Sequence, residues 1–327
     1  MRHLVTISEL DSEQIEHVLD RAEALSEVAG REIKKVPALR GRTVVNLFYE
    51  ASTRTSSSFE LAALRLSADV VTVRAQGSSV EKGESLKDTI QTLSAYDPSV
   101  IVMRTPFAGA PALAKQFTDA AIVNAGDGKH AHPTQALLDL FVMRRKLGSL
   151  EGKNVVIVGD ILHSRVARSL ITGLAKLGAI VTVCGPPTLI PREVEELGCA
   201  VAYSFEQLDV EPDVVYALRM QQERMDGGLI SSSGEYIKHY QVTPERLGAA
   251  WLMHPGPVNR GVELSGEVID SERALIEEQV RAGVAVRMAV LFEVVSALAT
   301  HDKETSTGET QVEAESLEEV KSEPAHA

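Results

Sequence analysis

The chain has 327 residues, too many for one small core and enough for about two domains of roughly 150 residues each. It is 44% hydrophobic and 24% charged, as in ordinary soluble globular proteins, and its formal net charge of −13 argues against general nucleic-acid binding. With two cysteines outside any CxxC pair, no signal-peptide pattern and no stretch near the ~20 apolar residues of a membrane span, we expect a cytoplasmic protein that binds no membrane.

Segments with strand and helix periods alternate through the first half of the chain. A first helix is indicated by the spacing of Ile15, Val18, Leu19 and Ala22, and a second by Phe59 with the apolar residues that follow it. Further helices are expected at 84–96 and 133–148. Buried strands are expected at 43–49, 69–74, 99–104 and 121–125.

The same alternation restarts at residue 154. Strands are expected at 154–159, 179–185, 213–218 and 249–254, with helices at 164–177, 191–198 and 271–299. This pattern predicts an α/β fold: two doubly wound parallel-sheet domains with helices on both faces, joined by interdomain helices near residue 140. Residues 301–327 hold eight acidic and two basic residues and no aromatic residue, so we expect a disordered acidic tail.

Polar clusters follow five of the predicted strands. Ligands in open α/β sheets bind at the carboxyl ends of strands, so five such clusters indicate one site assembled from both domains. The clusters are 50–55, Arg104, 159–165, 219–221 and 254–259.

The cluster at 52–55, Ser-Thr-Arg-Thr, begins a helix. Ser52 is placed to cap it, and the N–H groups of its first turn, with Arg54, would suit a phosphate. The alternative is a well-capped helix with a soluble rim. That alternative leaves unexplained an arginine in the first turn, where positive charge opposes the helix dipole.

The run His-Pro-Thr-Gln places His132 before a proline-initiated helix and Gln135 one turn into it. The helix N-terminus disfavours protonation, so a neutral imidazole could donate to a carbonyl oxygen. The alternative is an ordinary turn residue. We expect no metal, because His130 and His132 lack a third ligand nearby and there is no HExxH motif.

The remaining clusters supply cations. The stretch 156–170 begins like a dinucleotide fold but lacks GxGxxG, and Arg165 occupies space that a pyrophosphate would need, which favours a small charged ligand over NAD. Arg219 and Gln221 suit a carboxylate, and Lys82 lies in a Gly/Ser loop. Surface ion pairing or solvation is the alternative for each. With no credible nucleophile, the set indicates a transfer reaction that depends on positioning and electrostatics.

Three segments together carry a resemblance. Ser-Thr-Arg-Thr at 52–55, His-Pro-Thr-Gln at 132–135 and HPGPVNRG at 254–261 resemble, in order and separation, the catalytic chains of the aspartate carbamoyltransferases. The resemblance covers roughly residues 3–300. Ornithine carbamoyltransferases usually carry His-Cys-Leu-Pro late in the chain, whereas this sequence has MHPGP, and Lys82 also fits the aspartate type.

The resemblance implies roles for individual residues. The implied carbamoyl phosphate site is Ser52, Thr53, Arg54, Thr55, Arg104, His132, Gln135, Pro255, Gly256 and Pro257. The implied L-aspartate site is Ser78, Lys82, Arg165, Arg219 and Gln221, with Ser78 and Lys82 coming from a neighbouring subunit. The implied catalytic residues are Arg54, Thr55, Lys82, Arg104 and His132, and Glu50 is expected to pair with Arg165 and Arg224 when the domains close.

It also implies the domains and partners. Residues 1–140 would bind carbamoyl phosphate, completed by a C-terminal helix at 287–300, and residues 141–286 would bind aspartate. A homotrimer with shared sites, no cofactor, and association with other pyrimidine-pathway enzymes are expected. The alternatives are a carbamoyltransferase for ornithine or another amino acid, and a scaffold homologue without activity.

Overall fold

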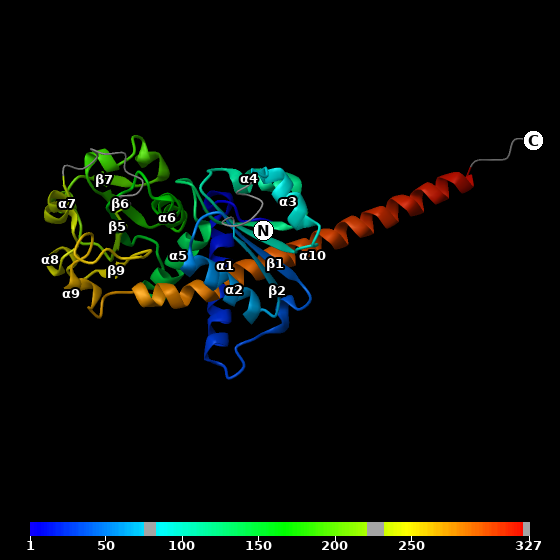
Figure 1. Ribbon diagram of the computed structural model, residues 1–327, viewed down its shortest axis with the longest axis horizontal. Helices are drawn as coiled ribbons and strands as arrows, with labels where there is room; N and C mark the ends of the chain where they lie inside the picture. Colours follow the sequence, from blue (N-terminus) through cyan, green and yellow to red (C-terminus); the bar gives the residue numbers. More distant parts are fainter. Residues whose placement is uncertain (75–82, 221–231, 323–327) are drawn as a thin grey trace, which may run out of the picture.

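The computed structural model describes residues 1–74, 83–220 and 232–322, with side chains as far as residue 299. Two parallel sheets lie side by side, each covered by helices (Figure 1). This is the α/β fold class that the alternating sequence pattern predicts.

The first sheet has the strand order β2-β1-β3-β4, and every pairing is parallel. Its central strand β1 is buried on both faces: Val44 and Phe48 pack in one apolar cluster, while Val45 and Leu47 pack in another. Such two-sided burial explains why the strand is a continuous apolar run in the sequence. The strands are β1 Thr43–Phe48, β2 Asp69–Arg74, β3 Val100–Thr105 and β4 Ala121–Asp127.

The second sheet has the strand order β7-β6-β5-β8-β9, also parallel throughout. Its edge strand β7 was not expected from the sequence, and the helix expected at 191–198 is a single 3-10 turn, Val194–Leu197. Left-handed residues on both sides, Glu193 and Gly198, confine that turn. The strands are β5 Asn154–Val158, β6 Ile180–Cys184, β7 Ala200–Ala202, β8 Val214–Ala217 and β9 Trp251–Met253.

Several helices begin where the sequence supplies a cap or an N-terminal proline. Asp11 and Gln14 form a reciprocal capping box at the first helix, and Pro133 occupies the first position of the fifth. The helices are α1 Ser12–Ser26, α2 Thr53–Arg65, α3 Leu86–Ser94, α4 Ala110–Ala114, α5 Pro133–Leu147, α6 Arg165–Lys176, α7 Ser233–Tyr240, α8 Pro244–Leu247, α9 Gly266–Ile269 and α10 Ile276–Ser322. Short 3-10 turns occupy Ile7–Glu9, Glu27–Gly30, Pro37–Leu39, Lys115–Phe117, Pro187–Leu189 and Phe205–Gln207.

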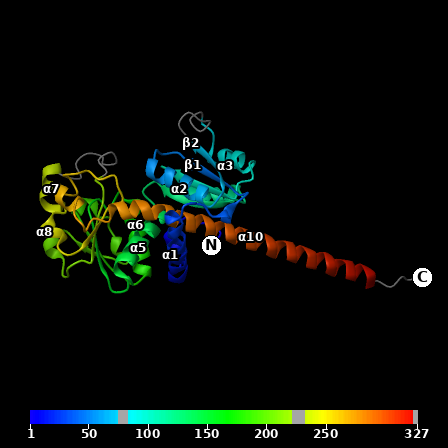
Figure 2. The same cartoon turned by 90° about the horizontal axis from the view of Figure 1, so that it is seen from below.

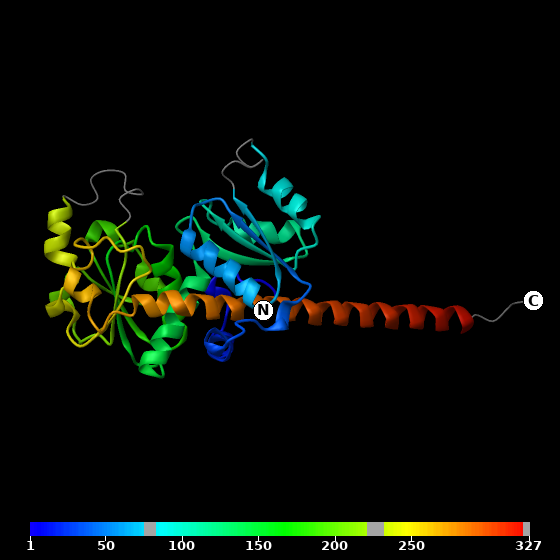
Figure 3. The ribbon, with the colours of Figure 1, turned by 60° about the horizontal axis from the view of Figure 1, so that its bottom comes forward.

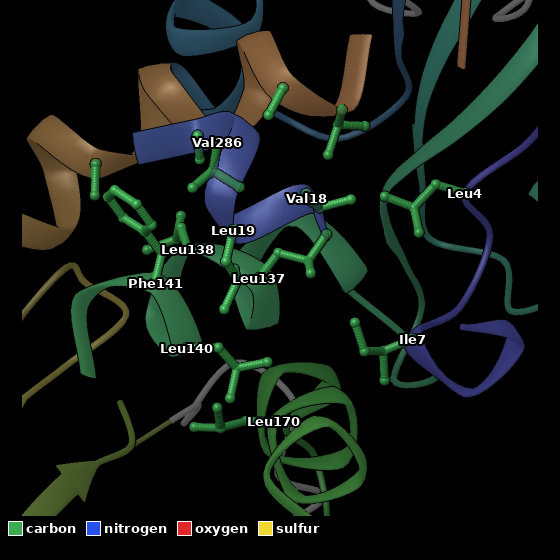
Figure 4. Packing of buried hydrophobic residues seen from close by; sticks show 14 of the residues in the cluster. Leu4, Ile7, Val18, Leu19, Leu137, Leu138, Leu140, Phe141, Leu170 and Val286 are labelled. Atoms are coloured by element: carbon green, nitrogen blue, oxygen red, sulfur yellow. The ribbon is translucent and has the colours of Figure 1, made fainter. Parts of the chain in front are cut away.

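Helix α5 lies between the two sheets and forms the centre of the core. It is buried almost all the way round, and it packs against α1, α6 and α10. Figure 4 shows Leu137, Leu138, Leu140 and Phe141 of α5 among apolar side chains from those helices. Because one cluster includes residues of both halves of the chain, the two domains share a core rather than meeting only at a surface.

Helix α10 also joins the two domains. It begins beside β9 and then packs against α5, α1 and α2 (Figure 2). Its segment Ile276–Ala299 is long and apolar enough to cross a membrane, which the sequence expectation overlooked. Most of that segment is buried inside the protein, so its apolar character is that of a core helix.

The backbone of α10 continues as helix to Ser322, which differs from the disordered tail expected at 301–327. Residues 301–322 contain six glutamates, which favour helix, although only one alanine and two lysines. The buried first half of α10 already supplies the formed turns from which a helix propagates. Figure 3 shows this last part of α10 extending away from both sheets.

Candidate active site

The predicted site residues come together in one pocket of about 1110 Å³ between the two domains. It lies at the carboxyl ends of β1, β3, β5, β8 and β9, as expected for parallel sheets. Its lining includes Glu50, Ser52, Thr53, Arg54, Thr55, Arg104, His132, Gln135, Arg165, Arg219, Pro255, Gly256 and Pro257. The other predicted residues, Ser78, Lys82, Gln221 and Arg224, lie outside the described residues.

The start of α2 forms one wall of the pocket. Ser52 occupies the N-cap position, but its side chain makes no capping hydrogen bond, contrary to the expectation from the sequence. Its carbonyl oxygen instead accepts from the Ser56 N–H at 2.9 Å. The turn therefore begins without using the hydroxyl of Ser52, which stays available to the pocket along with the first N–H groups of the helix.

Arg54 projects from this turn toward the opposite wall. A Cβ added to Gly256 would lie 3.1 Å from its Cζ, so the guanidinium sits against that glycine. Partial burial and the nearby charge of Arg219 both lower the pKa of Arg54. Two cations from different domains thus face the same space, which favours an anion between them.

Glu50 connects the two domains. Its Oε2 accepts from Arg165 Nη2 at 2.9 Å and lies 3.4 Å from Arg104 Nε. Arg165 belongs to the second domain and Arg104 to the first. Arg165 also donates to the carbonyl of Gly128 at 3.1 Å, so its head is held by the first domain at two points. The pairing of Glu50 with Arg165 is therefore present in this structure.

His132 is buried at the start of α5. Its backbone N–H donates to Ser169 Oγ of α6 at 2.9 Å, and its ring Nδ1 has no hydrogen-bond partner in the described structure. Burial holds the pKa of the imidazole well below 6.5, and the charges of Arg104, Arg165 and Arg287 lower it further. These effects favour a neutral ring. The sequence reasoning expected a neutral ring from the helix N-terminus alone, whereas burial and three arginines act on it here.

The segment after β9 forms the second wall. The His254 backbone N–H donates to Gln279 Oε1 at 3.0 Å, and His254 Nδ1 accepts from the Gly256 N–H at 2.8 Å. His254 Nε2 lies 3.2 Å from Glu263 Oε1, and burial lowers the pKa of this histidine. These bonds fix the backbone that presents Pro255 to the pocket.

Arg287 is a pocket residue that the sequence reasoning missed. It lies on α10, is buried, donates to the Gly283 carbonyl at 3.0 Å, and stacks over Phe59 at 5.2 Å. Burial lowers its pKa to about 10. A lone arginine within an otherwise apolar helical run was the available signal.

The pocket is strongly cationic. Among its lining residues, five arginines face a single carboxylate, Glu50. Within the described part of the chain, no three His, Cys, Asp or Glu side chains gather so as to hold a metal ion. The arrangement suits a small substrate with several negative charges, and it can stabilise an oxyanion through hydrogen bonds and positive charge.

Comparison with known proteins identifies the family to which this fold belongs. Models of the aspartate/ornithine carbamoyltransferases match residues 2–145, as the carbamoyl-phosphate-binding domain, and 151–294, as the aspartate/ornithine-binding domain. The chain belongs to this family of carbamoyl-group transferases.

Individual relatives are more specific. The chain is 54% identical over 299 residues to the aspartate carbamoyltransferase catalytic subunit of Chloroflexus aggregans, covering 89% of this chain and 97% of that protein. It superposes with a TM-score of 0.80 on Trypanosoma cruzi aspartate transcarbamoylase in complex with N-(phosphonacetyl)-L-aspartic acid, at 33% identity over 90% of this chain and 95% of that one. Ornithine carbamoyltransferase from Pyrococcus furiosus gives a TM-score of 0.81 at 26% identity, covering 90% and 97%.

The pocket predicts binding of a phosphate dianion that depends on Arg54. Replacing Arg54 by alanine removes charge-assisted hydrogen bonds, so the dissociation constant of inorganic phosphate should rise ~10- to 100-fold. Isothermal titration calorimetry measures it. Arg145→Ala, on the far end of α5 where Arg145 pairs with Glu23, is the matched control. Equal phosphate affinity in the two variants would contradict a phosphate site at Arg54.

The buried imidazole predicts a pH behaviour. Because the folded-state pKa of His132 lies well below 6.5, its ring should stay neutral as pH falls through that value. The unfolded chain takes up the proton there and the folded chain does not, so this residue makes stability decrease as pH drops below 6.5. Histidine NMR signals, assigned by their loss in His132→Gln, check the prediction. A ring shift that titrates near 6.5 would contradict it.

Proposed function

We propose that this chain transfers the carbamoyl group of carbamoyl phosphate to the amine of L-aspartate. The products are N-carbamoyl-L-aspartate and phosphate, in an early step of de novo pyrimidine biosynthesis. One observation carries the proposal: an uncharged, buried His132 lies in the same pocket as arginines from both domains. The names of the relatives at about half identity support the same activity.

The first wall suits carbamoyl phosphate. The N–H groups and hydroxyls of residues 52–55 with Arg54 and Arg104 would hold its phosphate, since helix N-termini and arginines both favour a dianion. Gln135 and the backbone around Pro255 and Gly256 would hold the carbamoyl amine. Thr55, Arg104 and His132 would polarise the carbamoyl carbonyl.

The reaction requires no covalent intermediate with the protein. The aspartate amine attacks the carbamoyl carbon, a C–N bond forms, and the carbonyl oxygen becomes an oxyanion. As the carbonyl re-forms, the bond from carbon to the phosphate oxygen breaks and phosphate departs. The amine proton passes to the leaving phosphate. A neutral imidazole can donate a hydrogen bond to the oxyanion, whose charge Arg104 also offsets.

The choice of aspartate over ornithine follows from charge. Aspartate brings two carboxylates to a pocket that has five arginines, whereas ornithine would bring a second ammonium group to it. Arg165 and Arg219 are the described residues proposed for the carboxylates, and Ser78, Lys82 and Gln221 are proposed beside them. The fold itself does not decide, because an ornithine enzyme superposes equally well.

The proposal includes a homotrimer with shared sites in the cytoplasm. Leu64 and Val71 of the first domain are apolar and exposed, which supports self-association there. Two free, buried cysteines, Cys184 and Cys199, suit a reducing compartment. The finer bounds, with residues 1–140 and 287–300 for carbamoyl phosphate and 141–286 for aspartate, belong to the proposal, as does association with other enzymes of the pathway.

Activity assays test the function. Carbamoyl phosphate with L-aspartate should yield carbamoyl product and phosphate in equal amounts, and L-ornithine should not replace aspartate. His132→Ala should lower kcat ~100- to 1,000-fold, because one positioned oxyanion donor is worth about that much. Activity with ornithine alone would favour the other branch of the family. Binding of carbamoyl phosphate without any turnover would favour a scaffold protein.

Mixing experiments test the shared site. Lys82→Ala and His132→Ala chains should each form nearly inactive trimers. If Lys82 serves a neighbour's site, subunit exchange restores roughly a quarter of the sites in an equal random mixture. Those sites take His132 from a Lys82→Ala chain and Lys82 from a neighbouring His132→Ala chain. Steady-state assays before and after exchange measure the recovery. If no activity returns although mass spectrometry detects mixed trimers, Lys82 does not cross a subunit boundary.

A further inference from the structure

A buried carboxylate lies directly behind the pocket. Asp139 is fully buried on α5, one turn beyond Gln135, and neither the sequence motifs nor the proposed reaction assigns it a role. Its two oxygens accept from three side chains on three different elements. Asp139 Oδ2 accepts from the Tyr216 hydroxyl at 2.7 Å, and Oδ1 accepts from Gln279 Nε2 at 2.7 Å.

The third donor is Gln135, which lines the pocket. Its Nε2 lies 3.1 Å from Asp139 Oδ1 and 3.3 Å from Oδ2. An amide whose NH₂ group is fixed in this way has its carbonyl oxygen on the opposite side, away from the carboxylate. Asp139 therefore sets Gln135 as an acceptor toward the pocket rather than as a donor.

The same carboxylate orients a second amide. Gln279 gives its NH₂ group to Asp139, so its Oε1 is turned to accept from the backbone N–H of His254 at 3.0 Å. His254 in turn accepts from the Gly256 N–H. Both walls of one subsite, the Gln135 amide and the backbone around Gly256, are thus connected through Asp139.

We propose that Asp139 is a positioning residue that makes this subsite select a substrate with an N–H donor, the carbamoyl NH₂ group, over an acyl phosphate that carries a methyl group there. The inference rests on the proposed function, whose substrate it specifies. A methyl group offers no hydrogen to the oriented Gln135 oxygen, so that acceptor would lose its partner on binding.

This role needs the ionised carboxylate, which burial disfavours: burial raises the pKa of Asp139 to about 7. The three hydrogen bonds and the charge of Arg287 act in the opposite direction and lower that pKa. All three side-chain partners act as donors, as an ionised carboxylate requires. An asparagine in its place is uncharged and offers one acceptor oxygen instead of two, so it cannot hold all three groups as donors, and the Gln135 amide is held less firmly.

The test compares the binding of carbamoyl phosphate with that of acetyl phosphate. In Asp139→Asn the dissociation constant of carbamoyl phosphate should rise ~10- to 100-fold, while that of acetyl phosphate stays within about twofold. The selectivity ratio, which is the dissociation constant of acetyl phosphate divided by that of carbamoyl phosphate, should therefore fall ~10- to 100-fold. Tyr216→Phe is the matched control, because it removes one hydrogen bond to Asp139 and leaves both amides oriented. Its ratio should equal that of the wild type.

A merely structural role would move both constants together. Parallel weakening of the two ligands in Asp139→Asn, or a wild type that does not distinguish them, overturns the inference. If Asp139→Asn fails to fold, Gln279→Met replaces it as the test. This variant removes the link between Asp139 and the His254 backbone, so the selectivity ratio should also fall. An unchanged ratio overturns the inference. The proposed function fails separately, if the wild type carbamoylates no amino acid, since the binding ratio is measured without turnover.

Discussion

The arrangement of the pocket depends on the sharing of Glu50 between two arginines. The pocket is lined by arginines from both domains, and like charges repel one another more strongly where they are partly shielded from water. The ion pairs of Glu50 with Arg165 and Arg104 offset part of that repulsion and join the second domain to the first. The remaining positive charge favours an anion in the pocket. Burial, and then the charges of the nearby arginines, lower the pKa of His132 and so oppose a proton on its ring.

Behind these arginines lies a second layer, made of hydrogen-bonded side chains around Asp139. There the buried Asp139 collects donors from α5, β8 and α10, and the 254–257 segment is tied to the same group through Gln279. The two layers suit different properties of a substrate. The arginines of the pocket suit its negatively charged groups, whereas the amides oriented by Asp139 suit its N–H groups.

Much of this was readable from the sequence, because parallel sheets have strong local signals. Apolar runs such as 43–49 marked the buried strands, and Arg54, Arg104, His132 and Arg165 were found because each follows a predicted strand or begins a helix. The failures have physical causes. β7 is only three residues long, and the use of a cap depends on backbone angles that Ser52 does not reveal. Asp139 and Arg287 interrupt apolar helical runs, and only tertiary contacts explain them. The substrate assignments required the family resemblance.

The double connection between the domains has a mechanical consequence. The chain passes from the first domain to the second through α5 and returns along α10, and both helices are packed into a core that the domains share. A body joined by one strand can swing and twist in every direction, whereas one joined by two stiff members is restricted to rotation about the line through them. Any relative motion of the two domains must therefore deform the core that they share or break the Glu50–Arg165 contact.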